Sequence, residues 1–128
     1  IIHQCGNAKT TEMKALPNII YQQFEYLDKI YDHYKWCDVI IARSGASTVS
    51  ELVIINKPSY LIPALYHRDR HQVYNAQFLQ NKNPNTVIHF NYKSLEEFIL
   101  NASQFKEQEN KYTTNERAEE LIIKTILL

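Results

Sequence analysis

Residues 40–52, IIARSGASTVSEL, decide the fold of this chain. The apolar residues at the start suit a buried strand, Gly45 permits a sharp reversal, and Val49 and Leu52 recur at helical spacing. The stretch therefore predicts a strand, a tight turn and a helix. The start of such a helix can hold an anion, because unpaired N–H groups and the helix dipole converge there. A single glycine matches neither the Walker loop nor the dinucleotide G-x-G-x-x-G pattern, which need further glycines at fixed offsets.

The composition is that of one globular domain, with 128 residues, 45% of them hydrophobic and 22% charged, and a net charge of zero. The zero net charge argues against nucleic-acid binding through a basic surface and against a polybasic membrane anchor. No apolar run approaches the roughly 18 residues that span a bilayer, and the N-terminus does not resemble a signal peptide. Cys5 and Cys37 form neither a C-x-x-C motif nor a disulfide framework, so we expect a reducing cytoplasm.

Along the chain, short apolar runs alternate with apolar residues at helical spacing. The apolar runs predict strands at 1–3, 19–21, 39–42, 60–62 and 86–88. The helical patterns predict helices near 27–37, 46–56, 73–81, 95–99 and 113–126. This alternation predicts an α/β fold, a parallel sheet with helices on both faces. Because the first strand already begins at Ile1, we expect the chain to be N-terminally truncated.

The ligand site of such a fold is expected in the crevice outside the carboxyl ends of its strands. Three loops should open there, at 24–27, 43–48 and 63–72. They are also the loops richest in polar and aromatic residues, which favours a binding site between them.

Glu51 is a candidate ligand residue in the helix that follows the predicted turn. A carboxylate in the first turn of that helix can accept hydrogen bonds from both hydroxyls of a sugar diol. The sequence TVSE at 48–51 also fits a capping box, in which Glu51 reaches back to a backbone N–H. The two roles are not exclusive, and the pattern leaves both open.

Arg43, Ser44 and Ser47 surround the turn and offer a cation and two hydroxyls near the helix N-terminus. A phosphate bound there would gain from all three side chains. Alternatively, one of the serines caps the helix and Arg43 pairs with a nearby carboxylate. The pattern alone does not separate these interpretations.

The segment HRDRHQVYN at 67–75 gathers donors and acceptors at the start of another helix. Gln72 and Asn75 are three residues apart and share one helix face, where their amides could bind the hydroxyls of a sugar. A capping box from Asp69 to Gln72 is the structural alternative. A metal site built on His67 and the histidine at i+4 is disfavoured, because no third ligand has the spacing of a known site.

Several motifs together resemble one known family. RSGASTVSE at 43–51 is followed by KP at 57–58, IP at 62–63 and DRHQVYNA at 69–76. YKWCD at 34–38 also resembles the lead-in to the R-S-G-A turn. In this order and spacing the motifs resemble the C-terminal domain of the MurG-type transferases. These are the undecaprenyl-diphospho-muramoylpentapeptide beta-N-acetylglucosaminyltransferases of peptidoglycan synthesis.

The resemblance implies a GT-B fold, in which two Rossmann-like domains face a cleft and the C-terminal one holds UDP-N-acetylglucosamine. Glu51 would bind the ribose hydroxyls, and the turn around Ser44 would lie against the diphosphate. Gln72 and its neighbours would contact N-acetylglucosamine, and the backbone near Phe24 would pair with uracil. The substrate-binding residues so implied are Phe24, Glu25, Arg43, Ser44, Gly45, Ala46, Ser47, Thr48, Glu51, His71, Gln72 and Asn75.

By the same resemblance, the full-length enzyme would transfer N-acetylglucosamine to the lipid-linked muramoyl-pentapeptide by direct displacement, with inversion and without a metal or other cofactor. The general base, the acceptor site and the membrane contacts would belong to the N-terminal domain, so this chain would hold no catalytic residue. The full-length protein would be cytoplasmic and peripheral on the inner face of the bacterial plasma membrane. Two alternatives stay open: another UDP-sugar-dependent GT-B transferase, such as a glycolipid synthase, or a stand-alone UDP-sugar-binding subunit with a separate acceptor-binding partner.

Overall fold

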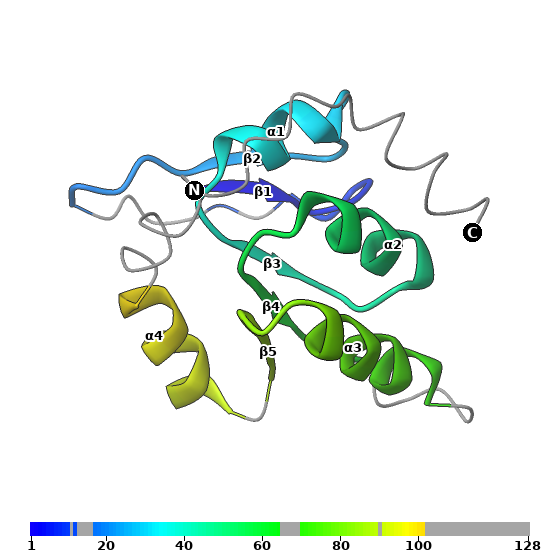
Figure 1. The fold of residues 1–128 in the computed structure, drawn as a ribbon. Coiled ribbons are helices and arrows are strands. Elements are labelled where there is room, and N and C mark those ends of the chain that lie inside the picture. The colour runs from blue at the N-terminus through cyan, green and yellow to red at the C-terminus, as the bar shows by residue number, and fades with distance from the viewer. Residues whose placement is uncertain (11, 13–16, 65–69, 90, 102–128) are drawn as a thin grey trace. The chain divides into compact units, whose positions relative to one another are not determined.

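The computed structural model describes residues 1–10, 12, 17–64, 70–89 and 91–101. The chain divides into two compact units, Ile1–Tyr34 and Lys35–Leu128. The elements, shown in Figure 1, are β1 (Ile2–Gln4), β2 (Gln22–Phe24), α1 (Ile30–Trp36), β3 (Ile40–Ala42), α2 (Ala46–Ile55), β4 (Ser59–Leu61), α3 (His71–Lys82), β5 (Thr86–Ile88) and α4 (Tyr92–Leu100). None of the helices described is long and apolar enough to cross a membrane. The predicted helix at 113–126 lies outside the described residues.

The first unit contains a two-stranded parallel sheet in which β1 pairs with β2. The predicted strand at 19–21 is wrong by three residues, because the ladder with β1 begins at Gln22. Asn18, with φ 63°, turns the chain just before the apolar pair Ile19 and Ile20, and Ile20 is 81% exposed. The apolar pair therefore belongs to a connection outside the sheet, and hydrophobicity alone misplaces the strand.

The second unit is built on a three-stranded parallel sheet in the order β3-β4-β5. In Figure 1, α2 and α3 lie side by side on one side of this sheet and α4 lies on the other. Tyr60 and Leu61 in β4 are both 0% exposed. Because neighbouring residues in a strand point to opposite faces, both faces of the sheet are covered. The predicted α/β architecture is confirmed, but the described strands form two hydrogen-bonded sheets where the sequence predicts one.

The ends of α2 and α3 depend on two asparagines, Asn56 and Asn83. Asparagine tolerates the left-handed backbone conformation that is otherwise typical of glycine. Asn56 adopts that conformation, with φ 53° and ψ 28°, at the C-cap of α2. Asn83 does not, since it is extended with φ −124°; its side chain instead donates to the Lys57 carbonyl at 2.8 Å.

Lys57 holds the amino end of the sheet together, just before β4. Its Nζ donates to the carbonyls of Lys35 at 2.9 Å and Cys37 at 2.6 Å, in the segment that leads to β3. Its own carbonyl accepts hydrogen bonds from Asn83 Nδ2 and, at 2.9 Å, from Ser59 Oγ. The K-P motif therefore has a structural role, because it ties the start of β4 to the segments that flank it.

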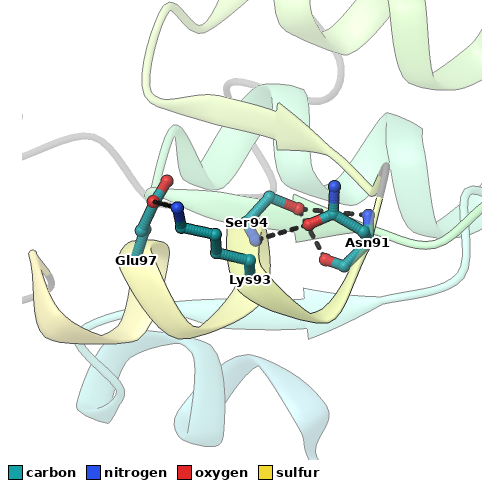
Figure 2. Close-up of polar contacts among 4 residues, drawn as sticks. All are labelled: Asn91, Lys93, Ser94 and Glu97. Atoms are coloured by element: carbon teal, nitrogen blue, oxygen red, sulfur yellow. Dashed lines mark hydrogen bonds and ion pairs between the residues drawn. The ribbon is translucent and has the colours of Figure 1, made fainter.

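A complete capping box starts α4, as Figure 2 shows. Asn91 Oδ1 accepts a hydrogen bond from the Ser94 N–H at 3.0 Å, and the Asn91 N–H donates to Ser94 Oγ at 3.4 Å. One turn further, Lys93 Nζ lies 4.0 Å from Glu97 Oε1. Ser94 Oγ also lies 2.6 Å from the hydroxyl of Tyr60, so the cap is anchored to a buried side chain of β4.

Candidate functional site

The predicted anion-binding turn follows β3 and leads directly into α2. Gly45 is the N-cap of α2, and the Val49 N–H makes a 2.9 Å hydrogen bond to its carbonyl. The amides of residues 46–48 therefore precede the hydrogen-bonded ladder, and glycine has no side chain to cap them. The sequence predicts that Gly45 permits a sharp reversal. The structure does not require glycine there, because φ −64° and ψ 154° suit any residue.

Glu51 lies in the second turn of α2, because the helix begins at Ala46. The predicted first-turn position is therefore wrong. The capping box is wrong for the same reason, since Gly45 is the N-cap that the TVSE pattern assigns to Thr48. Glu51 is half-buried, and its binding of a sugar diol stays a prediction.

α3 begins at His71, with Arg70 as a left-handed N-cap at φ 48° that makes no side-chain capping bond. The predicted capping box from Asp69 to Gln72 is wrong, because the N-cap lies one residue later and Gln72 Oε1 accepts a hydrogen bond from the Ala64 N–H at 2.8 Å. Asp69 itself lies outside the described residues. So does His67, so the metal-site alternative is not described by the structure.

A group of hydrogen bonds joins the starts of the two helices. Ser44, which is 0% exposed, donates through Oγ to the Gln72 carbonyl at 2.7 Å. Asn75 Nδ2 donates to the Ser44 carbonyl at 3.1 Å. With Ala64, these residues form what we call the Ser44 cluster, which links the ends of β3 and β4 to the first turns of α3. The prediction that Gln72 and Asn75 share one helix face is confirmed.

The alternatives left open for the turn can now be decided. Ser44 does not cap α2, because its hydroxyl is bonded to α3 and Gly45 is the N-cap. Ser47 is not the cap either, and it is exposed, as are Ala46 and Arg43. Among the described residues Arg43 forms no ion pair with a carboxylate.

Four predicted site residues remain, two in the first turns of α2 and α3 and two in the first unit. Thr48 is half-buried in α2, and His71 is exposed at the start of α3. In the first unit, the Phe24 carbonyl accepts a hydrogen bond from the Cys5 N–H at 2.9 Å. Glu25 Oε1 accepts one from the Ala8 N–H at 3.0 Å. The uracil contact predicted for Phe24 and Glu25 stays a prediction.

Ala64 is a member of the cluster that sequence reasoning did not identify. It contributes only its backbone N–H, so its residue type carries no signal. Its place could have been inferred from topology, because Pro63 and Ala64 follow β4 at the sheet edge where Ser44 follows β3.

The electrostatic character of this edge is positive. Each helix N-terminus carries a partial positive charge of about half a unit. Neither α2 nor α3 has an acidic residue in its first turn, and the exposed residues Arg43 and Arg70 come just before the two helices in the sequence. With no carboxylate in the first turn of either described helix, the two N-termini suit an anion with two charged groups. No cluster of three metal-ligating side chains occurs among the described residues.

Comparison with known sequences identifies a family and close relatives. The sequence model of the glycosyltransferase family 28 C-terminal domain matches residues 1–126. A protein of Rickettsia massiliae is 40% identical over 88 residues, 69% of this chain and 23% of that protein. A protein of Lawsonia intracellularis is 46% identical over 54 residues, 42% of this chain and 15% of that protein. Both are named UDP-N-acetylglucosamine--N-acetylmuramyl-(pentapeptide) pyrophosphoryl-undecaprenol N-acetylglucosamine transferase.

Comparison with solved structures gives the same fold. The crystal structure of Acinetobacter baumannii MurG matches with a TM-score of 0.70 and 20% sequence identity. The match covers 99% of this chain and 41% of that one. The chain therefore spans less than half of that structure and about a quarter or less of the curated relatives that it matches.

Proposed function

Because this chain belongs to the glycosyltransferase family 28 C-terminal domains, we propose that it binds UDP-N-acetylglucosamine as the donor half of an inverting transferase. The acceptor is the lipid-linked muramoyl-pentapeptide of peptidoglycan synthesis. The names of the Rickettsia massiliae and Lawsonia intracellularis relatives support both substrates. The likeness to part of the MurG crystal structure supports the assignment of the chain to one half of a two-domain enzyme.

The observation that carries the proposal is the pairing of two helix N-termini by the Ser44 cluster. The diphosphate of the donor accepts hydrogen bonds from the unpaired amides of residues 46–48 at the start of α2. The start of α3, with Arg70 as its N-cap, adds a second positive end. Arg43, before α2, and Ser47, in its first turn, are exposed and add a charge and a hydroxyl donor.

The other groups of the donor are assigned to the remaining predicted residues. Glu51 accepts hydrogen bonds from the two ribose hydroxyls. A carboxylate suits this task because its two oxygens act only as acceptors. Gln72 and Asn75, with the exposed His71, contact the N-acetylglucosamine. The backbone near Phe24 pairs with uracil.

In the reaction, the acceptor hydroxyl attacks the anomeric carbon while the bond to UDP breaks. Negative charge then grows on the departing diphosphate, and the two helix N-termini stabilise it without having to reorganise. This charge stabilisation is the task a divalent cation would otherwise perform, so we propose that donor binding needs no metal. The base that deprotonates the acceptor lies in the other half of the enzyme. The full-length enzyme acts as a peripheral protein on the inner face of the bacterial membrane, where it can reach a lipid-linked acceptor.

Calorimetric titration of the chain with UDP-N-acetylglucosamine tests this function. UDP-glucose and UDP-galactose are matched controls, because they share the nucleotide and lack the N-acetyl group. We expect UDP-N-acetylglucosamine to bind at least about tenfold more tightly than either control, a difference of roughly 1.4 kcal/mol. Equal affinity for all three would contradict the sugar assignment and favour another UDP-sugar-dependent transferase. No binding of any of them would contradict the function itself.

A further inference from the structure

We propose that Ser44 is a positioning residue of the donor site, which sets the spacing between the N-termini of α2 and α3. This inference rests on the proposed function and refines it. The hydroxyl of Ser44 has no exposed area and is already bonded to the Gln72 carbonyl at 2.7 Å, so it cannot also reach a ligand in solvent. Ser44 therefore acts on the diphosphate through α3.

The geometry of the contact explains why one serine can fix this spacing. Ser44 donates from its side chain to Gln72, in the first turn of α3, and accepts through its carbonyl from Asn75 at 3.1 Å, one turn later. Two bonds from different atoms of one residue restrict both the distance and the rotation of α3 relative to the turn after β3. A third bond, from the Ala64 N–H to Gln72 Oε1 at 2.8 Å, holds the same turn of α3 to the end of β4.

A fixed spacing matters because the diphosphate must meet both helix starts at once. Misplacing a binding group by about 1 Å is enough to lose much of its contribution. Among the hydrogen bonds of the described residues, removing the hydroxyl of Ser44 leaves the Asn75 bond as the one that joins α3 to this turn. The expected effect is a loss of affinity for the diphosphate, with little effect on the nucleoside.

Comparison of UDP with uridine as ligands separates positioning from general stability. In an NMR titration, which reaches millimolar affinities, Ser44→Ala should bind UDP about tenfold more weakly than the unmodified chain and uridine within about twofold. Ser50→Ala is the matched control, because Ser50 is exposed and, within the described part of the chain, its hydroxyl bonds only to the Ala46 carbonyl of its own helix. It should leave both affinities within about twofold.

Asn75→Ala removes the second bond, from Asn75 to the Ser44 carbonyl, and should reproduce the selective loss of affinity for UDP. This variant replaces Ser44→Ala in the test if Ser44→Ala fails to fold. Equal losses for UDP and uridine, or no loss for either, would overturn the positioning role while leaving the proposed function intact. Failure of the unmodified chain to bind UDP would overturn the proposed function and this inference together.

Discussion

At the scale of single residues, the site is defined by the atoms that remain available to a ligand. Gln72 Oε1 is occupied by the Ala64 N–H and Asn75 Nδ2 by the Ser44 carbonyl. Among the described residues, no partner is seen for Gln72 Nε2 or for Asn75 Oδ1. A sugar bound here would therefore accept a hydrogen bond from Gln72 and donate one to Asn75. The two amides are complementary, which favours a hydroxyl or acetamido group that both donates and accepts.

Glu51 offers the sharpest single-residue test of ribose binding. Because Gly45 is the N-cap of α2, Glu51→Ala removes a carboxylate without removing a helix cap. We expect it to weaken binding of UDP-N-acetylglucosamine by roughly 1 to 3 kcal/mol, the range for hydrogen bonds to a charged partner. Glu97→Ala, which removes an exposed carboxylate 4.0 Å from Lys93, is the control and should leave affinity unchanged. Equal affinities of the two variants would exclude Glu51 from the site.

Thr86 gives a residue-scale test of packing. Its Oγ1 is buried and has no hydrogen-bond partner among the described residues. Thr86→Val replaces that hydroxyl by a methyl group of similar size, so the free energy of unfolding should stay constant or rise by up to about 1 kcal/mol. Ser59→Ala, which removes a 2.9 Å bond to the Lys57 carbonyl, should lower it by about 1 kcal/mol. Denaturant unfolding that ranks the two variants in the opposite order would contradict this account.

At the scale of elements, the sequence predicts the second unit better than the first. β5 matches its predicted bounds, because a turn at Asn83 and Pro84 delimits the apolar run. α2 and α3 are also predicted, because their buried residues recur at helical spacing. β2 is misplaced because two of its three residues, Gln22 and Gln23, are polar, and its position is set by pairing with β1. Pairing partners are distant in sequence, so local patterns do not show them.

Lys57 links three segments of the second unit, and its removal should destabilise that unit. Lys57→Met keeps the aliphatic stem but leaves the carbonyls of Lys35 and Cys37 without this donor. We expect the free energy of unfolding to fall by roughly 1 to 3 kcal/mol. Lys93→Met, at a side chain 82% exposed, should change it by less than about 0.5 kcal/mol. Similar unfolding midpoints for both variants would show that the Lys57 bonds contribute little.

At the scale of the whole molecule, the sequence predicts the fold class and the polar residues at the starts of α2 and α3. It does not predict the hydrogen bonds that join these two helix starts. The placement of Gln72 and Asn75 on one face of α3 is confirmed because it depends only on helical spacing, whereas their binding of a sugar stays a prediction. The capping boxes assigned to Glu51 and Gln72 are wrong, because the N-caps are Gly45 and Arg70, and neither makes a side-chain capping bond. The division into two compact units is likewise a property of contacts that no local pattern reports.

The absence of a metal requirement is a prediction for the whole chain. If two helix N-termini stabilise the diphosphate, then EDTA should leave the affinity for UDP-N-acetylglucosamine within about twofold of its value in Mg²⁺. The measurement is a calorimetric titration in each buffer at equal ionic strength, which controls for screening. A loss of more than about tenfold in EDTA, restored by Mg²⁺, would contradict the metal-free account.

The central claim is that the paired starts of α2 and α3 form the diphosphate site. The most direct measurement is an amide NMR titration of the ¹⁵N-labelled chain with UDP and, separately, with uridine. The account predicts that UDP shifts the amide resonances of residues 46–48 and of His71 and Gln72, and that uridine leaves these five signals in place. UDP-induced shifts confined to other parts of the chain would contradict it.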